Sequence, residues 1–208
     1  SIPMDQPKTP PNINEMLMRP LFNTISFVAV LILMPMLTMR VFSEEKKTGT
    51  IELILTSPVK DWHVILGKFF AAFTLFASMI GLTIIYPLVL QLYGDPDWGP
   101  IWTGYIGLLL MGGSIITIGL FVSSLTENQI IAGVVCFGVA LFLWSLDFAS
   151  STISGQLGEV LGYLSVLRHY NTFEKGILDS TDCLFFLSFI YFGLFITVRS
   201  LESTRWRS

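Results

Sequence analysis

The polar side chains of this 208-residue chain are concentrated in one stretch, residues 39–68, which reads MRVFSEEKKTGTIELILTSPVKDWHVILGK. Ser43 can cap a short helix whose first turn holds Glu44 and Glu45, because the helix dipole favours carboxylates at that end. The dense mixture of Glu, Lys and Thr around Gly49 is typical of a surface that makes specific contacts with another molecule. This segment is therefore the first candidate for a functional surface.

The periodicity of the segment leaves two interpretations open. Ile51, Ile54 and Leu55 fall on one face of the expected helix, and Glu52 lies off that face. The helix could be an interfacial anchor that places its apolar face among lipid headgroups. It could equally be a docking element for a partner.

The elements that must position this segment are apolar helices. Of all residues 52% are hydrophobic and 13% are charged, about half the charged share of a soluble domain. A membrane span needs about 17–25 mostly apolar residues, and five stretches between successive charges meet or approach this length. We therefore predict an all-α fold, a polytopic membrane helical bundle in which residues 1–208 form one domain. The expected spans are about 20–41, 64–92, 100–124, 128–148 and 182–199.

The distribution of Lys and Arg predicts the orientation of the bundle. Eight of these residues fall on one side of the expected spans and four on the other. The positive-inside rule then makes segment 43–58 and the C-terminus cytoplasmic, and segments 1–19 and 150–181 external. Because no signal peptide precedes the external N-terminal segment, we expect the sequence to be a fragment or to begin after a missing upstream span.

Prolines and small residues refine the expected helices. Ser57 and Pro58 predict a cap and the first residue of a new helix. Pro35 and Pro87 predict kinks within two spans, either as fixed bends for packing or as hinges for gating. Four small residues of the third span would let a neighbouring helix approach closely: Gly112, Gly113, Ser114 and Gly119.

Two further polar groups lie outside the main segment. The connection from Ser123 to Gln129 carries one charge, Glu127, and either Thr126 or Glu127 could cap the fourth span. Glu127 could also provide a second contact to a cytoplasmic partner. On the external side, an amphipathic helix is expected from four apolar residues at helical spacing: Leu157, Val160, Leu161 and Leu164. It is followed by a cluster that could form a gate, contact substrate or form a headgroup-level polar rim: Arg168, His169, Tyr170 and Glu174.

Composition argues against several other classes of protein. No expected span has a charged residue at its middle, and both histidines lie in expected connections. The ionisable and histidine side chains that an intramembrane protease or haem site needs are therefore absent from the expected spans. Cys136 and Cys183 are too few for a disulfide framework or a Cys-rich metal site and are expected to be small core residues. The 12 Lys and Arg form no basic stripe for nucleic acid.

The main segment resembles the signature of the type-2 permease family of ATP-binding cassette (ABC) transporters, especially gliding-motility-type permeases. The resemblance continues through YPLVLQLYGDPDWGPIWTGYIGLLL, GLFVSSLTENQIIA and VRSLESTRW, and so covers about residues 12–207. The matching residues of the main segment are Met39, Arg40, Glu44, Glu45, Lys46, Gly49, Thr50, Glu52, Leu55, Ser57, Pro58, Gly67 and Lys68.

The resemblance implies a six-span permease subunit, without its first span here, that pairs with a second copy or paralogue. It also implies a separate ATP-binding subunit that holds ATP and Mg, no cofactor on this chain, and a bacterial inner-membrane exporter. In such families the first cytoplasmic loop forms a coupling helix, which carried over here is Glu44 to Ser57, a rigid lever continuous with the first two spans. Segment 150–181 then corresponds to a re-entrant element at the outer end. The expected contacts to the ATP-binding subunit are Arg40, Glu44, Glu45, Lys46, Gly49, Thr50, Glu52, Ser57, Pro58 and Glu127.

Two alternatives stay open beside this reading. The acids of the coupling segment could instead form a solvated face paired with Lys46 and Lys47. The whole chain could be a non-transporting scaffold or assembly factor that recruits a cytoplasmic partner through the same helix. The sequence contains no phosphate-binding GxxxxGK[ST] loop of its own, so any ATP hydrolysis is expected on another subunit, and this chain alone is not expected to be an enzyme.

Overall fold

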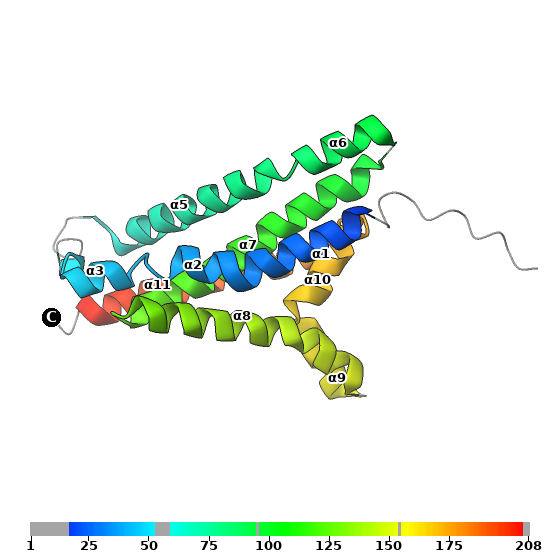
Figure 1. Cartoon of the computed structure of the whole chain (residues 1–208). Coiled ribbons are helices and arrows are strands. Elements are labelled where there is room, and N and C mark those ends of the chain that lie inside the picture. Colours follow the sequence, from blue (N-terminus) through cyan, green and yellow to red (C-terminus); the bar gives the residue numbers. More distant parts are fainter. Residues whose placement is uncertain (1–16, 53–58, 95, 154, 206–208) are drawn as a thin grey trace, which may run out of the picture.

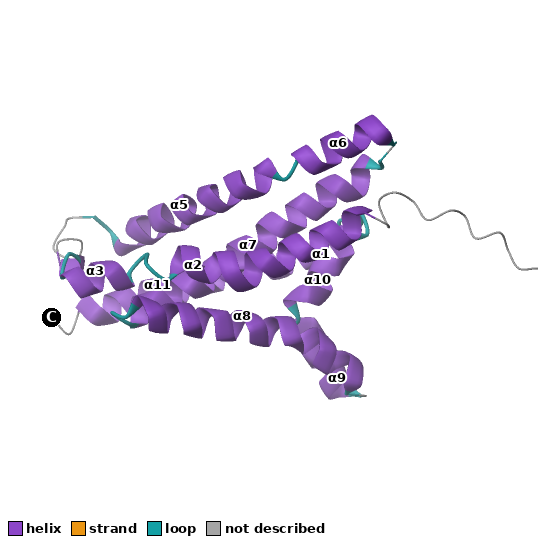
Figure 2. Cartoon of the chain, viewed as in Figure 1, coloured by secondary structure: helices purple, strands orange, loops and turns teal. Residues whose placement is uncertain are grey.

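The computed structural model describes residues 17–52, 59–94, 96–153 and 155–205, and every regular element within these ranges is a helix (Figure 1, Figure 2). In chain order the elements are α1 (Arg19–Val28), the π-helix η2 (Ala29–Leu33), α2 (Met34–Thr38), α3 (Ser43–Thr48), α5 (Asp61–Leu82), α6 (Ile85–Tyr93), α7 (Trp98–Leu125), α8 (Gln129–Thr152), α9 (Gln156–Leu164), α10 (Val166–Glu174) and α11 (Ser180–Arg205).

Five helical segments are long and apolar enough to cross a membrane: Arg19–Thr48, Asp61–Leu92, Trp98–Leu125, Gln129–Thr152 and Ser180–Ser203. The prediction of an all-α bundle with five spans is therefore confirmed. The fifth span rested on only 16 uncharged residues, but α11 is 26 residues long because the helix continues beyond the apolar stretch at both ends.

Helix α7 is the centre of the bundle. It packs against α2, α5, α8, α10 and α11, and its apolar side chains are buried along most of its length. A Cβ atom at Gly112 would overlap the ring of Phe76 on α5, and one at Gly119 would overlap the side chain of Thr38 on α2. The close helix approach predicted for this small-residue stretch is thus confirmed.

A departure from regular α-helix precedes each of the two prolines for which a kink was predicted. The first span widens into the π-helix η2 before Pro35, where the amide of Met34 bonds to the carbonyl of Ala29 instead of following the α-helical pattern. The second span breaks at Thr83 and Ile84, one turn before Pro87, and resumes as α6. A proline ring displaces the carbonyl four residues earlier, which is where each helix deviates.

The bundle has two chemically different ends. Helix α3 lies at one end together with the C-terminal part of α11, whereas α9 and α10 lie at the opposite end beside the start of α1 (Figure 1). Helix α9 diverges from the bundle in the same view. The polar segment that forms α3 and the predicted external cluster on α10 therefore lie at opposite ends of the spans.

Candidate functional site

Helix α3 is shorter than the lever expected from the sequence. It ends at Thr48 because Gly49 adopts a left-handed conformation (φ 72°), which only glycine adopts readily. A rigid helix from Glu44 to Ser57 is therefore wrong. Ser43 also does not cap the helix: Phe42 is the N-cap, and the Ser43 hydroxyl donates to the carbonyl of Met39.

The acidic first turn of α3 is present as expected, with Glu44 and Glu45 followed by Lys46 and Lys47. Other predictions for this segment lie outside the described residues, namely those for Ile54, Leu55, Ser57 and Pro58. The helix expected to begin at Pro58 begins in the structure at Asp61, after extended backbone at Lys60.

Ser123 of α7 anchors the turn that leads into α3. Its hydroxyl oxygen accepts hydrogen bonds from the backbone amides of Phe42 and Ser43, each at 3.0 Å, and the hydroxyl donates to the carbonyl of Met39 at 3.2 Å. Ser123 is fully buried. One side chain thus pairs with two amides at the start of α3 and with a carbonyl at the end of α2, and it fixes α3 to the centre of the bundle.

Lys68 of α5 also contacts α3 and the turn that precedes it. Its Nζ lies 2.5 Å from Glu45 Oε1 and 2.7 Å from the carbonyl oxygen of Val41, and it sits 4.6 Å from the centroid of the Phe42 ring. The lysine side chain is 19% exposed. Because this charge-assisted pair is shielded from water, it is stronger than an open surface ion pair.

The exposed polar residues of α3, together with Thr50 and Glu52 just after it, form a polar face in contact with solvent. We call this face the α3 tip, and its exposed residues are Glu44, Lys47, Thr48, Thr50 and Glu52. Lys46 is half-buried and interacts electrostatically with Glu127 of the α7–α8 connection. Ile51 is buried, as its place on the apolar face predicted. The structure thus brings the two predicted polar segments of this end together, while Glu45 faces inward toward Lys68.

The cap of the fourth span was predicted incorrectly. Helix α7 continues to Leu125, and Asn128 caps α8 by accepting hydrogen bonds from the amides of Ile130 and Ile131. Thr126 instead accepts a bond from the Asn128 amide at 3.2 Å. Asn is among the residues best suited to this position, which leaves Glu127 exposed and facing α3.

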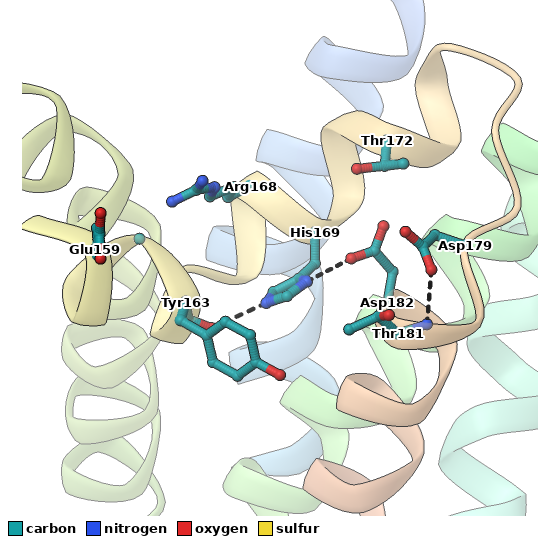
Figure 3. A pocket seen from close by; sticks show the side chains of 9 residues that line it. Glu159, Tyr163, Arg168, His169, Thr172, Asp179, Thr181 and Asp182 are labelled. Carbon is teal, nitrogen blue, oxygen red and sulfur yellow. Dashed lines mark hydrogen bonds and ion pairs between the residues drawn. The ribbon is translucent and has the colours of Figure 1, made fainter.

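At the opposite end, α10 separates the predicted external cluster into two groups. His169 Nδ1 lies 2.6 Å from Asp182 Oδ1 on α11, and His169 Nε2 lies 2.9 Å from the carbonyl oxygen of Tyr163 on α9 (Figure 3). Both ring nitrogens of His169 therefore face an oxygen atom, one on α11 and one on α9. The ring also stacks on Phe185, with centroids 4.0 Å apart. His169 therefore ties α9, α10 and α11 together.

Tyr170 and Glu174 point away from His169 into the bundle. Both are buried, and the Tyr170 hydroxyl lies beside the Glu174 carboxyl. Burial raises the pKa of Glu174 to about 7, while the neighbouring Tyr170 hydroxyl, Arg19 and Lys175 draw that pKa down only in part. Glu174 can therefore hold a proton at neutral pH.

This raised pKa predicts a pH-dependent stability. The native Glu174 carboxyl keeps its proton between about pH 4.5 and pH 7, whereas the unfolded chain loses it near 4.5, so stability falls as pH rises through this window. We expect Glu174→Gln to remove this loss, which is worth about 2 kcal/mol after a discount for solvent screening. Thermal unfolding in detergent between about pH 5 and pH 8 measures it. Parallel pH profiles for the wild type and Glu174→Gln would contradict the assignment.

Metal chemistry finds no support in the described part of the chain. No group of three or more His, Cys, Asp or Glu residues there could hold a metal ion. Cys136 is buried and Cys183 is half-buried, and both are free thiols, in line with their expected packing role.

Comparison with known proteins decides between the classes of membrane protein that this geometry admits. Residues 2–171 match the family model described as ABC-2 family transporter protein. The chain belongs to the ABC-2 transporter family. The segments that form α1 to α10 all fall within or across the matched region, so the ABC-2 assignment covers both ends of the bundle.

Two curated ABC-2-like relatives from Escherichia coli, from strain K12 and strain O157:H7, are each named "Probable multidrug ABC transporter permease YbhR". Each is 26% identical over 137 residues, which is 65% of this chain and 37% of that protein. The chain thus spans little more than a third of the length of these relatives. The family match and the five long apolar helices make it an integral membrane protein.

Sequence reasoning missed three residues that organise these sites. Ser123 lay in what was read as a loop, although it belongs to α7. Lys68 was noted only as part of the family resemblance, and Asp182 was given no role. No local signal identifies such residues, because their partners lie 13 to 84 positions away in the sequence.

Proposed function

We propose that this chain is a membrane permease subunit of an ATP-driven ABC exporter, with ATP and Mg held by a separate subunit that docks on the α3 tip. The observation that carries the proposal is the pair of anchors on α3. Because Ser123 and Lys68 fix the helix to α7 and α5, a displacement of the α3 tip is transmitted to two spans at once. Arg40, Lys46 and Glu127 lie beside the tip and complete the proposed contact.

The proposal includes an orientation and a location. The α3 tip and the C-terminus face the cytoplasm, and α9 and α10 face outward, in the inner membrane of a bacterium. Support comes from the excess of Lys and Arg at the α3 end of the bundle. In this orientation α9 and α10 form the re-entrant element at the outer end, with Arg168, His169, Tyr170 and Glu174 within it.

The transport path in this proposal runs between two permease copies, along the surface where α1 and α2 lie beside α8. We call this surface the seam. Two hollows lie on this seam, one of about 370 Å³ beside Pro35 and one of about 670 Å³ nearer the outer end. The larger hollow includes exposed polar side chains on membrane-spanning helices, namely Asn23, Thr24 and Ser145. Polar groups are costly against lipid, which favours a second copy or a path for cargo on this face.

Reconstitution of the complete transporter tests the function. The permease, in its full-length form, and its ATP-binding subunit are placed in vesicles, and ATP-dependent movement of ethidium, an amphipathic cation, is measured. We expect movement that Glu44→Lys lowers about tenfold, the effect of losing one charge-assisted contact. Gln156→Lys, an added charge at the far end on α9, is the matched control and should leave transport unchanged.

The same experiment distinguishes the scaffold alternative. A scaffold would retain the ATP-binding subunit in pull-down experiments and show no ATP-dependent dye movement. Equal loss of transport in Glu44→Lys and Gln156→Lys would contradict docking at the α3 tip.

A further inference from the structure

The end of the bundle opposite α3 contains a polar hollow that the proposed transport mechanism does not use. Its volume is about 440 Å³, within the range of small-molecule sites. It lies between α9, α10 and the start of α11 (Figure 3). We call it the His169 hollow, and its charged and aromatic lining consists of Glu159, Tyr163, Arg168, His169, Asp179 and Asp182.

The charges of the hollow are of both signs and are spatially separated. Arg168 and Glu159 lie on one side of His169, and Asp179 and Asp182 lie on the other (Figure 3). His169 Nδ1 and Asp182 Oδ1 lie 2.6 Å apart and bond to each other. Arg168 is exposed, and no carboxylate among the described residues lies within ion-pair distance of it. The hollow therefore offers one cation for an anionic group and carboxylates for a cationic one.

Apolar side chains surround the hollow. On α9, Leu157, Val160 and Leu164 are 71%, 57% and 50% exposed, although the helix is amphipathic. Ile177 and Leu178, just before α11, are similarly exposed. A polar hollow within an apolar rim at the end of membrane-spanning helices matches the boundary between lipid headgroups and acyl chains.

We propose that the His169 hollow binds the headgroup of a membrane phospholipid that carries both a phosphate and a primary ammonium, as phosphatidylethanolamine does. Arg168 binds the phosphate, and Glu159 and Asp179 accept hydrogen bonds from the ammonium. His169 and Asp182 form the floor and position α10 against α11. The acyl chains lie along the exposed apolar residues of α9. The inference depends on the bundle being in a membrane and not on transport.

The lining discriminates between headgroups. A quaternary ammonium such as choline is usually held by a cage of aromatic rings, but among the described residues lining the hollow only Tyr163 and His169 contribute rings, and the His169 ring is bonded to Asp182. A primary ammonium instead donates hydrogen bonds, which carboxylates and the hydroxyls of Thr172 and Thr181 can accept. An anionic glycerol headgroup would leave Glu159 and Asp179 without a cation. Ethanolamine is therefore the best match.

Native mass spectrometry of the purified full-length protein tests the proposal. Dioleoyl phosphatidylethanolamine, phosphatidylcholine and phosphatidylglycerol are added in equal amounts, and the bound lipid is counted. We expect phosphatidylethanolamine to bind about tenfold more than the other two, the difference that one well-formed charge-assisted contact gives. Arg168→Gln and Glu159→Gln should each remove most of this preference.

A matched control and a competitor complete the test. Lys175→Gln changes an exposed cation at the same end that does not line the hollow, and it should keep the preference. Soluble glycerophosphoethanolamine has the same headgroup without acyl chains and should not compete at equal concentration. Equal binding of the three lipids, an unchanged preference in Arg168→Gln with native helix content, or full competition by the soluble headgroup would each overturn the proposal.

Discussion

Replacement of Lys68 by methionine should lower transport about tenfold more than it lowers ATP hydrolysis in the reconstituted complex. Methionine keeps most of the aliphatic length of lysine but removes the ammonium that bonds to Glu45 and to the Val41 carbonyl. Glu45 then keeps a carboxylate in a half-buried position, and its Oε2 already lacks a partner among the described residues. A lost hydrogen bond to a charged group costs about 1.5–3 kcal/mol, which corresponds to a tenfold or larger change in the anchored population.

Two control variants distinguish the loss of the Lys68 contact from the loss of a positive charge in general. Lys60→Met removes an exposed lysine just before the same helix and should leave both rates unchanged. Lys68→Arg keeps the cation and should retain most of the coupling. The double variant Lys68→Met with Glu45→Gln should recover stability relative to Lys68→Met, because the unpaired carboxylate is also removed. Equal losses of transport and ATP hydrolysis in Lys68→Met would contradict a role in coupling.

The position of Lys68 also changes how movement of α3 can reach the membrane. The sequence suggested a lever connected to the first two spans through the chain itself. Gly49 interrupts that helix, so stiffness along the chain cannot carry the movement. Contacts across the bundle replace it: Lys68 joins α3 to α5, and Ser123 joins the α2–α3 turn to α7. Since α7 packs against α3 at one end and against α10 at the other, a displacement there reaches both ends of the bundle.

The sequence was sufficient for the features that depend on local composition. Apolar length predicted the five spans, proline predicted the breaks before Pro35 and Pro87, and small residues predicted the contacts at Gly112 and Gly119. Each of these follows from the residue itself and its immediate neighbours. The amphipathic pattern of residues 157–164 predicted α9 for the same reason.

The sites depended on pairing across the fold, and there the sequence was insufficient. Ser43 and Thr126 carry the right chemistry for helix caps, but Phe42 and Asn128 occupy the cap positions, because α3 already begins at Ser43 and α8 begins only at Gln129. The four polar residues 168–170 and 174 are neighbours in the chain, yet the turn of α10 directs His169 toward α11 and Tyr170 with Glu174 toward α1. Helical rotation of 100° per residue makes such divergence common, and only the packing of the neighbouring helices shows it.

Replacement of Ser123 by alanine should be the most destabilising single-atom change at the α3 end. The hydroxyl oxygen is the acceptor for two buried backbone amides, and no local carbonyl bonds to the Phe42 amide in its place among the described contacts. Each buried donor left unpaired costs about 1–3 kcal/mol, so we expect the loss of both bonds to cost about 2–6 kcal/mol. Thermal unfolding in detergent should show a clearly lower midpoint, with faster proteolysis near α3.

The neighbouring residue supplies a control matched in position, burial and chemistry. Ser124 is also buried on α7, but its hydroxyl donates to the Phe121 carbonyl and to Ser200, and it accepts no backbone amide. Ser124→Ala therefore leaves no backbone amide without an acceptor, and it should lower the unfolding midpoint much less than Ser123→Ala does. Ser123→Thr keeps the hydroxyl but adds a methyl group in a fully buried position, so it should fall between the two. Equal destabilisation by Ser123→Ala and Ser124→Ala would show that the two amides find other partners, and α3 would then lose its anchor to α7.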